Sequence, residues 1–152
     1  KYDHKDVVAE KLKGREIECA VLGNRKPMAS AIGEVIPKSS FYSFESKYID
    51  ADGAALDIPA KLDDETIKRV QALAIETYRL LECEGMSRVD MFLTESGDLY
   101  INEINTIPGF TKISMYPKLW EISGISYKEL ITKLIQYAIE SNKDNNQLIQ
   151  AE

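Results

Sequence analysis

Residues 87–114, SRVDMFLTESGDLYINEINTIPGFTKIS, contain the side chains whose types and spacing best suit chemistry. Two apolar, β-rich runs at 89–93 and 99–104 flank the polar turn ESGD, a pattern that predicts a β-hairpin. We expect Thr94 to pair with Leu99 beside the turn. This register decides which polar side chains lie opposite each other further along the two strands.

The expected register places Asp90 opposite Glu103 and Arg88 opposite Asn105. Because side chains two apart on a strand share a face, Asp90, Glu103 and Asn105 should point to the same side. Opposed carboxylates lie about 5 Å apart at Cβ and repel each other, and a divalent cation would offset that repulsion. Three oxygen donors without His or Cys suit a hard ion, Mg²⁺ or Mn²⁺, held partly by substrate phosphates. The alternative is a solvated hairpin face with ordinary charges.

The composition is that of one soluble globular domain with an acidic balance. The 152 residues include 19 Lys plus Arg and 25 Asp plus Glu, a net charge of −6, which argues against nucleic acid or an anionic membrane as partner. No apolar run is as long as a membrane span, and no signal peptide opens the chain. Cys19 and Cys83 lack metal or redox spacing, so we expect reduced thiols in a cytoplasmic protein. The chain begins without Met, which suggests a fragment.

Apolar patterning outside the hairpin predicts further strands and helices, and together they indicate an α+β fold with an antiparallel sheet packed against helices. Strands are expected over 7–9, 17–22 and 32–36, the last two antiparallel, with a polar connection at 10–16 in which Gly14 is free to adopt positive φ. Helices are expected from Asp63 or Asp64 to about Glu82, from Tyr116 to near Gly124, and from a capping box at Ser126 and Glu129. The polar tail 141–152 is expected to be disordered.

Two segments without regular periodicity are candidates for loops that act on a ligand. Residues 37–59 are rich in aromatic side chains, which favours a lid over plain disorder. Residues 106–111, TIPGFT, follow the second hairpin strand and offer N–H groups that could hold an anion, although an ordinary turn is the simpler interpretation.

Four motifs resemble the C-terminal half of D-alanine–D-alanine ligases, which are ATP-grasp enzymes. They are REIECAVLGN (15–24), FYSFESKYID (41–50), RVDMFL (88–93) and NEINTIPGFTKISMYPKLW (102–120), in the family's order and spacing. The resemblance extends over about residues 5–140. It implies that residues 1–140 form part of an ATP-grasp domain with a lid at about 37–59, and that the family's N-terminal domain is absent.

The resemblance also implies roles for individual residues. Asp90, Glu103 and Asn105 would bind Mg²⁺ or Mn²⁺, with Glu103 between two ions, and Arg88 would stabilise an acyl phosphate. Tyr48 would close the lid over the substrate. The implied ATP-binding residues are Glu10, Lys11, Leu12, Glu16, Phe41, Lys47 and Phe92. The implied pocket for the second D-alanine consists of Gly109, Ser114 and Met115. Ala9 departs from the family, which usually has Glu there near the adenine amino group, and this leaves the adenine contacts in question.

The implied reaction joins two D-alanines at the expense of ATP, through an acyl phosphate, to give the dipeptide used in peptidoglycan. The family resemblance further implies a cytoplasmic enzyme that is a homodimer at full length. Because much of the ATP and first D-alanine sites would be missing, we expect the 152 residues alone to be inactive. The alternatives are another ATP-grasp ligase, a nucleotide- or Mg²⁺-binding module without turnover, and a purely structural α+β domain.

Overall fold

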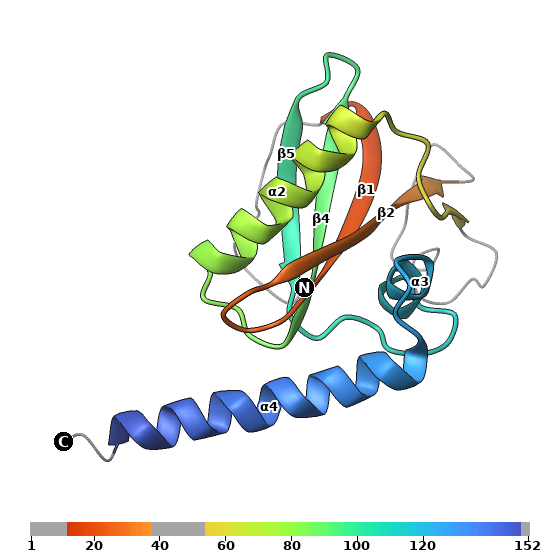
Figure 1. Cartoon of the computed structure of the whole chain (residues 1–152). Helices are drawn as coiled ribbons and strands as arrows, with labels where there is room; N and C mark the ends of the chain where they lie inside the picture. Colours follow the sequence, from red (N-terminus) through yellow and green to blue (C-terminus); the bar gives the residue numbers. More distant parts are fainter. Residues whose placement is uncertain (1–11, 38–53, 150–152) are drawn as a thin grey trace, which may run out of the picture.

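The computed structural model describes residues 12–37 and 54–149. Within these ranges the chain forms five strands, β1 (Gly14–Leu22), β2 (Met28–Pro37), β3 (Ala54–Asp57), β4 (Met86–Thr94) and β5 (Leu99–Asn105), and three helices, α2 (Asp64–Leu80), α3 (Met115–Ile122) and α4 (Tyr127–Ile149). The strands form one sheet in the order β3-β2-β1-β4-β5, and every neighbouring pair is antiparallel. The predicted α+β class, with an antiparallel sheet packed against helices, is confirmed (Figure 1). In the described part of the chain, no helix is both long and apolar enough to cross a membrane.

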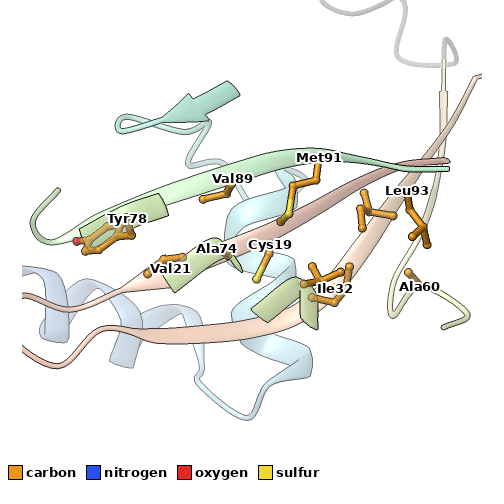
Figure 2. Close-up of a cluster of buried hydrophobic side chains, with 11 residues drawn as sticks. Cys19, Val21, Ile32, Ala60, Ala74, Tyr78, Val89, Met91 and Leu93 are labelled. Atoms are coloured by element: carbon orange, nitrogen blue, oxygen red, sulfur yellow. The ribbon is translucent and has the colours of Figure 1, made fainter. Parts of the chain in front are cut away.

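One face of the sheet is covered by α2, as its helical spacing predicted (Figure 1). Asp63 caps the helix by accepting a 2.8 Å hydrogen bond from the backbone N–H of Thr66, which satisfies one of the unpaired donors of the first turn. Val70, Ala74 and Tyr78 then lie buried on the side toward the sheet. Figure 2 shows this core, in which side chains of α2 meet inward-facing residues of β1, β2 and β4.

The other face of the sheet is only partly covered. α3 and the first half of α4 pack over one end of it, around the fully buried side chains of Tyr116, Leu119, Trp120 and Leu130. Apolar residues of β1 and β2, such as Leu22, contribute the sheet side of this second core. The remainder of the face carries mainly polar side chains, with Leu56 among them. This uncovered area is therefore where a ligand has access to the sheet.

Strand β1 begins earlier than the sequence predicted, because Gly14–Glu16 belong to the sheet instead of a connection. Gly14 pairs with Thr94 and does not have positive φ. A Cβ at Gly14 would lie 2.6 Å from the carbonyl oxygen of Leu93. Glycine is thus needed there for close backbone approach to β4 and not for conformational freedom.

The hairpin of β4 and β5 has the predicted partners at one end and different ones at the other. Asp90 pairs with Glu103 as expected, whereas Leu93, not Thr94, pairs with Leu99. The turn has three residues, because the N–H of Thr94 donates to the carbonyl of Asp98. A register shift between Asp90 and Met91 then restores the predicted pairing.

Two segments expected to lack regular structure contain elements. Ala54–Asp57, placed in the predicted lid, forms β3 and pairs with the end of β2, while residues 38–53 lie outside the described part of the chain, as does the strand predicted at 7–9. Residues from Ser141 to Ile149, predicted to be disordered, continue α4. Extending an existing helix adds hydrogen bonds without a new nucleation cost, and Arg25 holds the extension through a 2.8 Å ion pair with Asp144.

Candidate functional site

An open cavity of about 420 Å³ lies on the uncovered part of the sheet, beside the start of α3. Its walls come from all five strands, from the loop that joins β5 to α3 and from the first residue of α3. The lining residues are Glu16, Glu18, Val35, Leu56, Arg88, Glu103, Asn105, Gly109, Thr111, Ile113, Ser114 and Met115. Seven of these were predicted as site residues from the sequence, and they come from segments nearly a hundred positions apart in the chain.

Strand alternation explains why the polar side chains gather on this face. In β1 the residues that alternate with Glu16 and Glu18, such as Ile17 and Cys19, are fully buried in the core under α2. The same alternation in β4 sends Arg88 and Asp90 to the cavity side, since Val89 and Met91 lie in that core. The pairing of β1 with β4 sets Glu18 directly opposite Asp90.

Arg88 is the centre of a compact charged group. Its Nε donates to Asp90 Oδ1 at 2.7 Å and its Nη2 to Asp90 Oδ2 at 2.6 Å, a two-point pair of the kind that guanidinium and carboxylate groups favour. Its Nε also lies 3.1 Å from Glu18 Oε2. Burial lowers the pKa of Arg88, but the hydrogen bond to Asp90 and the attraction of Glu18, Asp90 and Glu103 outweigh that effect and raise it. Arg88 therefore stays charged at every physiological pH.

The three expected metal ligands share the cavity face but differ in accessibility. Asp90 is 2% exposed and lies beneath the Arg88 guanidinium, whereas Glu103, opposite it, is exposed. The Oδ1 of Asn105 accepts a 3.2 Å hydrogen bond from the N–H of Ile107, which orients the amide. Among the described residues, no three Asp, Glu, His or Cys side chains gather closely enough to hold a metal by themselves.

The donor chemistry nevertheless fits a hard divalent ion. Two carboxylates and an amide oxygen, with substrate phosphates and water, are the ligands that Mg²⁺ takes in proteins. Each carboxylate oxygen of Asp90 has a second lone pair beyond the one that Arg88 uses. A cation at Asp90 and Glu103 is therefore compatible with the Arg88 pair in charge and in donor type.

The loop between β5 and α3 brings the predicted pocket residues together at the cavity edge. A Cβ at Gly109 would lie 3.1 Å from Ser114 Oγ, so the two residues are adjacent although they are five positions apart. Ser114 is the N-cap residue of α3, and its Oγ accepts a 3.1 Å hydrogen bond from the N–H of Thr111. Met115 follows, buried, as the first residue of the helix. This edge offers a hydroxyl beside the backbone of Gly109.

The predicted ATP-binding residues are only partly within the described structure. Glu16 lines the cavity, and Phe92 lies opposite it on β4. Leu12, half-buried, precedes β1, and neither it nor Phe92 is among the described residues that line the cavity. The remaining predicted residues lie outside the described ranges: Glu10, Lys11, Phe41, Lys47 and Tyr48.

Glu18 is a site residue that the sequence interpretation missed. It lines the cavity, is 6% exposed and forms an ion pair with Arg88. A signal was present in the run REIECAVL, where Glu16 and Glu18 are two apart in a strand and therefore share a face.

Comparison with known proteins identifies the relatives of this architecture. The family described as "D-ala D-ala ligase C-terminus" matches residues 1–136. The D-alanine–D-alanine ligase of Shouchella clausii is 59% identical over 147 residues, which are 97% of this chain and 40% of that protein. The D-alanine–D-alanine ligase structure from Coxiella burnetii has a TM-score of 0.82 and 42% identity, over 93% of this chain and 36% of that one. The Bacillus anthracis D-alanine–D-alanine ligase complexed with ATP has a TM-score of 0.72 and 28% identity, over 89% and 43%. The chain thus spans about two fifths of the curated relatives it matches.

Proposed function

Because the chain belongs to the family of D-alanine–D-alanine ligase C-terminal regions, within the ATP-grasp fold, we propose that the protein containing it joins two D-alanines with ATP. The observation that carries the proposal is the cavity itself, in which Arg88, Glu103 and Asn105 face the same space as Gly109 and Ser114. A cationic group and oxygen donors suited to phosphates thus lie beside a hydroxyl suited to an amino acid carboxylate.

The proposed reaction has two steps. The carboxylate of one D-alanine attacks the γ-phosphate of ATP and releases ADP, and the amine of a second D-alanine then displaces phosphate from the acyl phosphate. Arg88 stabilises the negative charge that develops in both steps, because its guanidinium is held at the cavity wall and stays protonated. Asp90, Glu103 and Asn105 would hold Mg²⁺ or Mn²⁺, which when bound neutralises charge on the ATP phosphates.

The remaining residues bind and orient the substrates. Glu16, on the cavity wall, would accept from the ribose hydroxyls. Phe92, opposite Glu16 on β4, and Leu12, which precedes β1, would contact the adenine. Ser114 and the N–H of Gly109 receive the carboxylate of the second D-alanine, with Met115 beneath. The reaction needs no protein nucleophile, and positioning with electrostatic stabilisation accounts for it.

The proposal extends to the whole protein. A role in peptidoglycan synthesis would place it in the cytoplasm, and the family resemblance implies a homodimer. Lys47 and Tyr48, which lie outside the described residues, would contact the reactants. The 152 residues alone should not catalyse the reaction, because they span about two fifths of the length of the matched relatives. Detection of ADP and dipeptide from the isolated chain would contradict this last point.

The test is to incubate the full-length protein with ATP, Mg²⁺ and D-alanine and to measure ADP and D-alanyl-D-alanine together. Equal amounts of both are expected. A panel of other D-amino acids and D-lactate separates the alternatives, because preferential use of another acceptor at neutral pH would indicate a different ATP-grasp ligase. ATP binding without ADP release, or no binding at all, would reject the ligase proposal.

A further inference from the structure

We infer that Glu18 is a positioning residue that holds the Arg88 guanidinium at the cavity wall, an inference that rests on the proposed function of Arg88. Glu18 Oε2 lies 3.1 Å from Arg88 Nε. The Glu18 side chain is 8% exposed and that of Arg88 is 19% exposed, so the pair is shielded from solvent screening. Both side chains line the cavity in which the reaction is proposed to occur.

The position of Glu18 is fixed by the centre of the sheet. It lies on β1, paired with Gly33 on one side and with Asp90 on the other. Asp90 is in turn paired with Glu103, so three carboxylates form one row across β1, β4 and β5. Arg88 is the cation that lies against two of them. β1 is the middle strand of the five-stranded sheet, so hydrogen bonds to β2 and β4 hold the backbone of Glu18 from both sides.

Glu18 and Asp90 have different roles toward Arg88. Asp90 contacts Arg88 through both oxygens and is also a proposed cation ligand, so its charge is shared between two partners. Glu18 is not among the proposed ligands. It would therefore hold the guanidinium in place whatever Asp90 binds. Without the Glu18 charge, Arg88 would keep only the anchor that the cation also uses, and its alignment with the reacting phosphate would loosen.

The first measurement is steady-state kinetics of the full-length Glu18→Gln protein, which keeps the size of the side chain and removes its charge. Loss of alignment should lower kcat by about tenfold or more, with KM for ATP changed by less than about twofold. The matched control is Glu34→Gln. Glu34 also forms an ion pair with an arginine, Arg15, at 2.6 Å, but neither residue lines the cavity. Glu34→Gln should keep the wild-type kcat.

The second measurement is a double-mutant cycle on the melting temperature of the nucleotide-free, metal-free protein. Glu18→Gln should lower the melting temperature in the wild-type background but not in an Arg88→Met background, where the Glu18 charge has lost its partner. Equal kcat for Glu18→Gln and Glu34→Gln, or equal melting shifts in the two backgrounds, would overturn the inference. If the wild-type protein makes no dipeptide, the proposed function fails instead, and the melting cycle still reports on the pair.

Discussion

Arg88 and Asp90, two residues apart on β4, form an ion pair with contacts of 2.7 and 2.6 Å, and the Asp90 side chain is only 3% exposed. The pair provides a positive charge within the acidic hairpin. Repulsion between Asp90 and Glu103 was the reason to expect a divalent cation from the sequence, and Arg88 already supplies a counter-charge. One guanidinium thus offsets part of the charge of the neighbouring carboxylates, and the oxygen donor set and the family are what favour a cation here.

Asp90→Asn should therefore destabilise the fold. The substitution removes the two-point partner of the Arg88 guanidinium and leaves Glu18 as its carboxylate neighbour. The loss of unfolding free energy should therefore lie below the roughly 3 kcal/mol that a fully uncompensated buried charge costs. Urea unfolding of the 152-residue chain, followed by the fluorescence of the single, buried Trp120, would measure it. Glu103→Gln is the control, since Glu103 is exposed and its loss should change stability by less than about 0.5 kcal/mol. A merely solvated acidic face would instead gain stability from both substitutions.

Glu103→Gln should affect the cation requirement of the full-length protein while leaving its fold intact. Losing even an outer partner of a ligand lowers metal affinity roughly 10–100-fold, so losing a direct ligand should raise the Mg²⁺ concentration for half-maximal activity at least about tenfold. Titration of activity with Mg²⁺ at saturating ATP would measure this. Glu95→Gln, at the exposed hairpin turn, removes the same charge from the same hairpin and should leave the titration unchanged. Parallel shifts in both variants would mean that only net charge matters.

The sequence predicted the positions of the helices, the antiparallel pairing and the polar face of the hairpin, because those depend on local periodicity. The sequence-based prediction was wrong for the hairpin turn, because the length of the turn and the register beside it depend on how the two strands meet. The turn was assumed to have four residues, but Gly97, at φ 85°, closes a three-residue turn. The register error this causes is undone by the shift beside Asp90, so Asp90 and Glu103 pair as expected although the turn differs.

The same distinction applies to the site. The predicted cavity residues came from motif positions. For Glu18 the sequence indicates a shared face with Glu16, but its place beside Arg88 depends on the pairing of β1 with β4, which sets it opposite Asp90. The extent of α4 was also beyond local reasoning. Its polar final turns resemble a disordered tail, and contacts to residues far away in the sequence, such as Arg25 with Asp144 and Ser141 with Glu84, hold them.

Two tyrosines hydrogen-bond to β1 and the turn after it, and both should make stability fall at high pH. The Tyr78 hydroxyl donates to the carbonyl of Gly23 at 2.7 Å, and the Tyr116 hydroxyl to that of Val21 at 3.0 Å. Burial raises the pKa of both phenols above the ordinary value of 10.0. In the unfolded chain they ionise near pH 10, while in the folded chain they stay neutral, so their contribution is complete below pH 10 and is lost as the pH rises above it.

Urea unfolding at pH 9 to 11 would measure this loss of unfolding free energy. The loss should reach about 1 kcal/mol for each tyrosine at one pH unit above 10. Other groups titrate in this range, so the comparison is with the Tyr78→Phe/Tyr116→Phe protein. That variant should be less stable at neutral pH by about 1 kcal/mol for each lost hydrogen bond, and its stability should fall less steeply with pH. Identical slopes for the two proteins would contradict the pKa shifts.

Gly33 sets how closely α3 approaches the sheet. A Cβ at Gly33 would lie 2.7 Å from Met115 Sδ, so the Met115 side chain would have to move, and 3.1 Å from Leu119 Cδ2, which is a tight contact. Gly33→Ala should cost about 1–2 kcal/mol of unfolding free energy, at the lower side of overpacking effects because the Met115 side chain can bend away. Since Met115 also lines the cavity, the full-length variant should show a raised KM for the second D-alanine and an unchanged KM for ATP. The Met115→Ala background tests whether contact with the Met115 side chain is the cause, because it removes the atoms that the new Cβ would meet. Gly33→Ala should then destabilise that background less than the wild type, and an equal cost in both would place the strain elsewhere than between β2 and α3.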